Sequence, residues 1–171
     1  DIRRGYPLSV YDTASVTHER GIEVITHVIL GLPGETTDDM QATADYIAHQ
    51  PIQGVKFQLL HVLKGTDLYT DYLGQSFHTL TLDEYTDILI RCIELMPPEM
   101  VIHRITGDGP KNILAAPDWS RNKKQVLNHI HHCMKIRNTW QGAVIYNRKE
   151  FLFMSQDTLI ALQINGALHA E

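Results

Sequence analysis

Polar and charged side chains gather where three strand-like segments of this 171-residue sequence end. The segment 24–30 runs into Gly31-Leu-Pro-Gly-Glu35, and Thr36 to Asp39 then offer the N-cap oxygens and negative charge of a helix start. This turn would place backbone N–H groups and two glycines at the C-terminal end of a strand. In parallel α/β proteins, ligands bind at that end. Taken alone, the motif is explained equally well by an ordinary loop whose glycines serve the turn.

Two more strand-like segments end in glycine-containing polar loops. Residues 55–62 run into Leu63-Lys-Gly-Thr66, and residues 101–105 run into Thr106-Gly-Asp-Gly-Pro-Lys111. Helical patterns at 38–49 and 82–96 separate the strands. This alternation predicts an α/β fold in which parallel strands 24–30, 55–62 and 101–105 lie adjacent, with all three ends at one edge, as in part of a (β/α) barrel.

Alternation along the strands assigns several polar residues to the barrel interior. His27 shares a face with Ile29, whereas the non-ionisable positions between them suit packing against helices. By the same argument Lys56 and Gln58 face inward, which is costly unless they meet a ligand or each other. We interpret Lys56 and Gln58 as lining a functional cavity, and His27 alone as a hydrogen-bonded core histidine. One residue of register decides which way Arg104 faces.

The loops at the strand ends contain a second group of candidates. Two lysines, one aspartate and two glycines outline a polar pocket suited to a carboxylate or phosphate: Lys64, Gly107, Asp108, Gly109 and Lys111.

A histidine-rich helix near residue 130 suggests a metal site. His129 and Cys133 are four residues apart and share a face, with His131 and His132 between them. However, an apolar stripe explains this helix without metal (Val126, Leu127, Ile130 and Met134). Because structural zinc needs four ligands with supporting groups, we predict no metal site.

The composition of the chain limits the classes of protein to which it can belong. With 43% hydrophobic residues the chain can bury one core, and no apolar run is long enough to cross a membrane, so we expect no membrane partner. Cys92 and Cys133 both lie on predicted helices, which favours a reducing cytoplasm. The first residues, Asp1-Ile-Arg-Arg-Gly5, resemble the interior of a longer protein.

The net charge of −5 is unevenly distributed along the chain. Residues 1–100 hold six Lys and Arg against 15 Asp and Glu, whereas residues 101–171 hold nine against five. A basic segment such as 104–149 can bind an anionic partner such as RNA, although a solvated face with one anion site is the commoner explanation.

Together, these motifs resemble a known family. Residues 21–36 are similar to a later barrel strand and loop of radical S-adenosylmethionine (radical SAM) proteins. Residues 56–66, 101–108 and 116–120 narrow the resemblance to the bacterial YhcC/YtqA-type subfamily, which is related to the radical SAM domain of the Elongator catalytic subunit. Residues 126–128 and 139–142 resemble the end of that family's chain, so 1–142 is the barrel part and 143–171 an extension of unknown role.

The resemblance implies reductive cleavage of S-adenosylmethionine at a [4Fe–4S] cluster, giving a 5′-deoxyadenosyl radical that abstracts a substrate hydrogen. The residues that it places along the nucleoside of S-adenosylmethionine are His27, Ile29, Gly31 and Gly34. The residues that it places on the substrate side are Lys56, Gln58, His61, His103, Arg104 and Asp108.

Two departures from the family shape the functional expectation. The cluster needs three cysteines in one loop, and Cys92 and Cys133 cannot supply them. The first half of the barrel is also absent, so Asp1 would enter it midway. We expect a fragment of a radical SAM enzyme that binds no cluster and is inactive without the N-terminal half. The alternatives are a non-catalytic α/β module that binds an anionic ligand or RNA, and a different half-barrel that binds phosphate at Gly31–Glu35.

Overall fold

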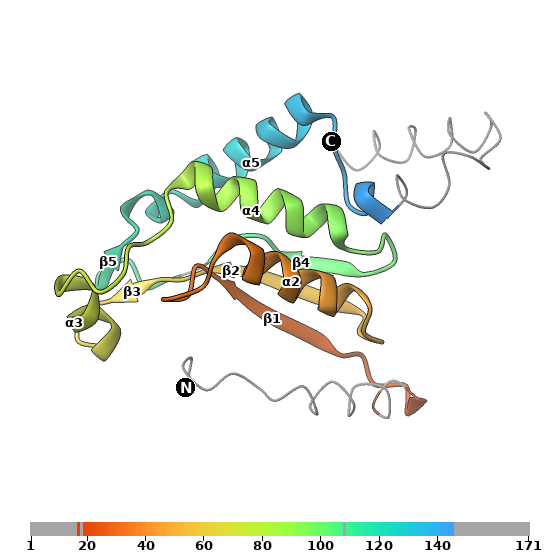
Figure 1. The fold of residues 1–171 in the computed structure, drawn as a ribbon, viewed down its shortest axis with the longest axis horizontal. Coiled ribbons are helices and arrows are strands. Elements are labelled where there is room, and N and C mark those ends of the chain that lie inside the picture. The colour runs from red at the N-terminus through yellow and green to blue at the C-terminus, as the bar shows by residue number, and fades with distance from the viewer. Residues whose placement is uncertain (1–16, 18, 108, 146–171) are drawn as a thin grey trace.

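The computed structural model describes residues 17, 19–107 and 109–145. In chain order the elements are β1 (Ile25–Leu30), α2 (Thr37–Ala48), β2 (Gly54–Leu59), β3 (Val62–Leu63), α3 (Asp67–Leu73), α4 (Leu82–Leu95), β4 (Val101–Arg104), β5 (Leu114–Ala116), the 3₁₀ helix η1 (Asp118–Arg121) and α5 (Lys123–Arg137). A parallel sheet has the strand order β1-β2-β4, and β3 pairs with β5 in a small antiparallel sheet (Figure 1).

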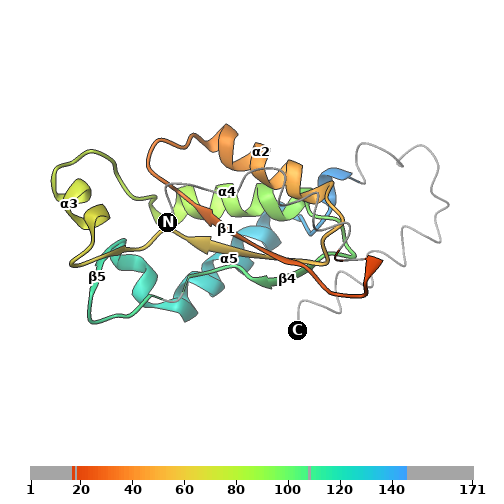
Figure 2. The same ribbon diagram turned by 90° about the horizontal axis from the view of Figure 1, so that it is seen from below.

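The helices lie on one side of the parallel sheet. Figure 1 shows α2, α4 and α5 above the strands, and in the view from below the strands pass in front of α4 (Figure 2). The core between these layers contains Val28 and Leu30 of β1, Phe57 of β2 and Tyr85 and Leu89 of α4, all buried. Burial of this apolar face is the main force that holds the helices on the sheet.

Two of the helices over the sheet, α2 and α4, begin at matching sequence signals. Thr36 accepts a hydrogen bond from the backbone N–H of Asp39, whose carboxylate accepts one from the N–H of Thr36. Thr81 and Glu84 form the same reciprocal box at the start of α4. These boxes satisfy backbone donors that a helix start otherwise leaves without partners.

The predicted parallel arrangement of the three strands is confirmed. The predicted single strand 55–62 is wrong at its end, because β2 stops at Leu59 and Val62 pairs with Ala116 in the second sheet. The N–H of Leu60 still donates to Leu30 at 3.0 Å, after which the chain changes sheet. In the part of the chain that the structure describes, no helix is both long and apolar enough to span a membrane.

Candidate polar face of the parallel sheet

Polar side chains occupy the face of the parallel sheet that points away from the helices. Val55, Phe57 and Leu59 of β2 are buried, whereas the alternate residues Lys56 and Gln58 are only partly buried. This pattern confirms that both polar residues point away from the helices, whereas their contact with a cavity stays a prediction. We call this side of the sheet the open face, because none of the described helices covers it.

Strand register brings three candidates into one row across the open face. The Cα of His27 in β1 pairs with that of Lys56, and Lys56 pairs with Arg104 in β4. The next pair along the strands is Ile29 with Gln58. Together with His103 of β4, the sheet therefore gathers six of the predicted residues, drawn from all three strands.

A β-bulge settles the direction of Arg104. Val55 pairs with Ile102, but the next residue, Lys56, pairs with Arg104, so β4 has one extra residue at His103. A regular register without the bulge would pair Lys56 with His103 and Phe57 with Arg104, which would put Arg104 on the helix side. The imidazole of His103 lies over Gly54, where a Cβ would come 2.7 Å from its Nε2 atom. Glycine at 54 therefore leaves room for His103 beside the row.

His27 is hydrogen-bonded, as predicted, but it is exposed rather than part of the core. Desolvation lowers its pKa, and the positive charges of Lys56 and Arg104 lower that pKa further. The imidazole is consequently neutral at pH 7. The Nε2 amide group of Gln58 lies 3.2 Å from Nδ1 of His27, so the amide donates there and the ring proton resides on Nε2.

The Gly31–Glu35 turn is built largely on contacts within the chain. The N–H of Gly31 points to Sδ of Met40 at 3.1 Å, and the N–H of Leu32 donates to Oε2 of Glu35 at 3.3 Å. Gly31 and Gly34 both have φ of +86°, which glycine adopts without strain. Turn geometry explains both glycines, and their contact with a ligand stays a prediction.

Glu35 enters the sequence prediction only as the last residue of the Gly31–Glu35 turn, with no role of its own. Burial raises the pKa of its carboxyl group, although the hydrogen bond from Leu32 acts in the opposite direction. Its position at the end of the glycine turn was the available signal, because a carboxylate there can accept the N–H groups of the turn.

The loops at the strand ends place the remaining candidates. His61 packs against the loop after β4, where a Cβ at Gly107 would come 2.3 Å from its ring and one at Gly109 would come 3.0 Å from it. Lys64 and Lys111 are exposed on loops joined by a hydrogen bond from Lys64 N–H to Ile113. Asp108 lies outside the described residues.

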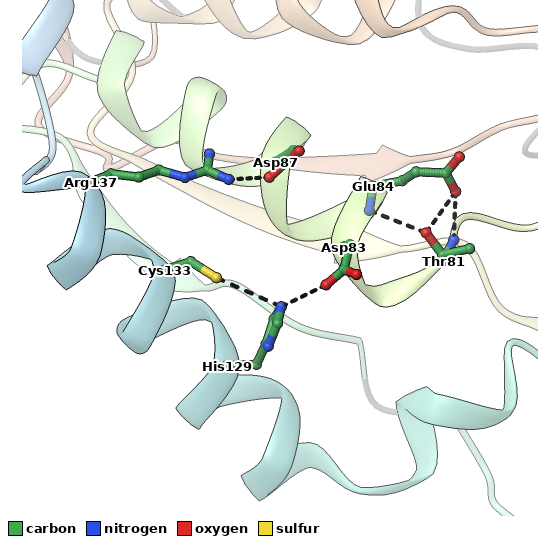
Figure 3. A network of polar contacts seen from close by, with 7 residues as sticks. All are labelled: Thr81, Asp83, Glu84, Asp87, His129, Cys133 and Arg137. Carbon is green, nitrogen blue, oxygen red and sulfur yellow. Dashed lines mark hydrogen bonds and ion pairs between the residues drawn. The ribbon is translucent and has the colours of Figure 1, made fainter.

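The histidine-rich helix α5 contacts α4 through side chains (Figure 3). His129 lies 3.1 Å from a carboxylate oxygen of Asp83 and 3.7 Å from the sulfur of Cys133, and Arg137 contacts Asp87. Among the described residues, no group of three or more His, Cys, Asp or Glu side chains is arranged to hold a metal ion. The described part of the network therefore connects two helices.

A cavity of about 290 Å³ lies away from the ends of the parallel strands. Its lining residues precede β2 and β4 (Ala48, Gln50, Ile52, Gln53, Pro97, Glu99 and Met100). The cavity is therefore at the opposite edge from the candidate loops, and we assign it no role in the site.

Comparison with known proteins identifies the family. Residues 52–136 match the model of the radical SAM C-terminal domain. The chain is 37% identical over 150 residues to YtqA of Bacillus subtilis (strain 168), covering 87% of this chain and 47% of the relative. It is 30% identical over 123 residues to YhcC of Escherichia coli (strain K12), covering 71% of this chain and 40% of the relative.

A solved structure gives the same result for the fold. The archaeal Methanocaldococcus infernus Elp3 with an N-terminal deletion aligns with a TM-score of 0.65 at 18% identity, covering 87% of this chain and 37% of that one. The chain thus spans about half the length, or less, of the relatives that it matches. From the matched domain and these relatives we conclude that the chain belongs to the radical SAM family and carries its C-terminal part.

Proposed function

We propose that the chain forms the C-terminal part of the barrel of a radical SAM enzyme, and that its open face lines the interior where the substrate binds. The observation that carries this proposal is the row of polar side chains from His27 through Lys56 to Arg104, on the face that the described helices leave uncovered. In the interior of a barrel, such polar side chains can bind a substrate. The two thiols, which form no disulfide, favour a cytoplasmic location.

The described residues do not fit an iron–sulfur cluster. Cys92 is buried in the core, where burial raises the pKa of its thiol to about 12, and Cys133 lies on α5. Three thiolates from one loop are needed, and these two cysteines come from different helices. We therefore assign the cluster to a segment outside the described residues.

The open face does fit the nucleoside of S-adenosylmethionine. Ile29 offers an apolar contact for a base, and His27 and Gln58 beside it offer hydrogen bonds. In this family S-adenosylmethionine supplies the hydrogen-abstracting radical. The part of this chain is to bind and orient the reactants, and the neutral His27 ring can donate a hydrogen bond from Nε2.

Production of 5′-deoxyadenosine tests the proposal. We would fuse the part of YtqA that precedes the matched region to this chain, reconstitute the fusion anaerobically and measure 5′-deoxyadenosine release by chromatography. We expect release by the fusion, and neither an iron–sulfur absorbance band nor release from the present chain alone. A fusion that folds and holds iron and sulfide, yet releases no 5′-deoxyadenosine, contradicts the proposal.

RNA binding by α5 is the second candidate. The helix contains no acidic residue, and its outward side carries exposed Lys124, Asn128, His131 and Lys135. Such a stripe matches a phosphate backbone. We expect salt-dependent binding of a structured RNA in fluorescence anisotropy, which Lys124→Glu with Lys135→Glu abolishes. Binding that is insensitive to this double substitution rules out α5 as the surface.

A further inference from the structure

Two side chains of like charge lie side by side on the open face. Lys56 and Arg104 are directly paired on neighbouring strands. Like charges at such positions destabilise a sheet. Within the described residues, neither side chain has an ion pair or a hydrogen bond. Arg121 and Arg137, by contrast, each contact a carboxylate.

The surroundings of this pair contain no negative charge from the sheet. The other side chains at open-face positions belong to Ile25, His27, Ile29, Gln58 and Val101, and His103 lies beside them over Gly54. Lys56 and Arg104 are also partly buried, unlike the exposed loop residues Lys64 and Lys111. A cation that serves only solubility can lie on an exposed loop instead. The repulsion between Lys56 and Arg104 lowers the stability of the folded chain, and an anion bound between them would offset that loss.

We infer that Lys56 and Arg104 form a binding site for an oxyanion, either a phosphate or a carboxylate group of the substrate. The placement of this site inside a barrel rests on the proposed function, whereas the charge argument does not. The guanidinium of Arg104 donates two parallel hydrogen bonds to two oxygens of such a group. Lys56 adds a compact charge with three donors, and the ring of His27 lies next to Lys56 in the same row.

Anion binding is then linked to a proton at His27. The charges that face His27 from the neighbouring strands are Lys56 and Arg104, and Gln58 holds its Nδ1 atom. Their positive charges help to lower the pKa of His27, so a bound anion that compensates them raises that pKa. Near the usual histidine pKa, binding therefore takes up a proton at His27, and affinity for a carboxylate, which stays ionised in this range, increases as the pH falls toward 6.

The test is a nuclear magnetic resonance titration of the chain with inorganic phosphate and, separately, with acetate, both at ionic strength matched with sodium chloride. We expect saturable shifts at Arg104 Nε–H and at Gln58, together with a higher pKa of the His27 ring in the saturated state. Lys56→Met and Arg104→Gln each weaken binding by about tenfold. The matched control Arg91→Gln, which removes an exposed guanidinium on α4, leaves binding unchanged.

The two ligands identify the source of the oxyanion. Tighter phosphate binding assigns the site to a phosphorylated substrate, and tighter acetate binding assigns it to a carboxylate. The inference is overturned if shifts are no larger than those caused by chloride, or if Lys64→Met or Lys111→Met weakens binding while Lys56→Met does not. Amide spectra of every variant check that it is folded.

This equilibrium measurement needs neither S-adenosylmethionine nor a cluster. A chain that binds phosphate through Lys56 and Arg104, but whose fusion releases no 5′-deoxyadenosine, keeps the anion site and refutes the proposed function. Release of 5′-deoxyadenosine without anion binding refutes the site alone.

Discussion

At the scale of single residues, Gly31 and Gly34 differ although both have φ of +86°. A Cβ at Gly31 would approach Leu80 Cδ1 to 2.9 Å, whereas one at Gly34 would meet no atom within 4 Å. We expect Gly34→Ala to cost about 1 kcal/mol of unfolding free energy through backbone strain, and Gly31→Ala to cost more because Leu80 must also move. Urea unfolding measures both, and Leu80→Ala should remove the excess. Equal losses of unfolding free energy in the two single glycine variants would show that the Leu80 side chain moves aside at no cost.

The stability of a Lys56→Met variant tests the charge arrangement of the open face. An ion pair broken in a buried site would cost about 3–5 kcal/mol. Because the nearest paired side chain is the cation Arg104, we expect instead no loss, or a gain of up to about 1 kcal/mol. Thermal and urea unfolding decide between these results. A loss of several kcal/mol would show that a carboxylate from outside the described residues pairs with Lys56.

Some residue positions followed from the sequence and others did not. Alternation in β2 was sufficient for Lys56 and Gln58, because an apolar face and a polar face are unambiguous there. Arg104 was undetermined, since a one-residue bulge reverses the side on which it falls and no pattern in a four-residue strand reveals a bulge. The alternation pattern alone predicts a core position for His27, because a single sequence does not tell whether another layer covers its side of the sheet.

At the scale of the elements, the capping box of α4 gives a pH-dependent contribution to stability. Hydrogen bonds from the backbone and hydroxyl of Thr81 hold the pKa of Glu84 below its usual value. A lowered pKa in the folded state means that the contribution is complete above the usual glutamate pKa, near 4.3, and is lost as the pH falls below it. We expect Thr81→Ala to cost about 1 kcal/mol at pH 7 and somewhat less at pH 3, where the hydroxyl would still accept the N–H of Glu84 but would no longer donate to a carboxylate.

Glu84→Gln is the matched control for this cap. Glutamine keeps the box without a titrating group, so the stability of this variant should lose the dependence on pH that Glu84 contributes. Unfolding free energies at pH 7 and pH 3 provide the measurement. If Thr81→Ala is equally destabilising at both, the charge of Glu84 has no part in the cap.

The packing of α5 on α4 includes an ion pair between two partly exposed side chains. Arg137 contacts Asp87, with side-chain exposures of 38% and 56% (Figure 3). Because water screens such a pair, we expect a coupling energy of less than about 1 kcal/mol in a double-mutant cycle with Arg137→Gln and Asp87→Asn. The coupling should shrink in 1 M salt. A larger, salt-insensitive value would mean that the pair is more deeply enclosed than its exposure indicates.

At the scale of the whole molecule, the parallel sheet has two outer strands, β1 and β4, among the described elements. Unpaired strand edges promote pairing with other chains. We therefore expect the isolated chain to self-associate at micromolar concentrations in sedimentation velocity. Val101→Lys places a charge on β4 at a side chain that is 54% exposed, and it should reduce association without unfolding the chain. A monomer at all concentrations would show that both edges are protected.

The parallel sheet and its helix layer were predictable because strand–helix alternation leaves few topologies for consecutive parallel strands. The departure of the chain into the β3–β5 sheet was not predictable, because residues 55–62 resemble one continuous strand and the pairing of Val62 depends on β5, about fifty residues later. The end of β2 and the start of β3 are therefore set by pairing with the distant strand β5, and the local sequence pattern does not reveal them.

The packing of His61 against Gly107 and Gly109 also limits how this sequence can change over time. A side chain at 107 must displace the imidazole, so a mutation there is tolerated only after residue 61 has become smaller. The two positions, far apart in the chain, should therefore exchange in a fixed order: first the histidine, then the glycine. Related sequences that have lost glycine at 107 are expected to have lost histidine at 61 as well.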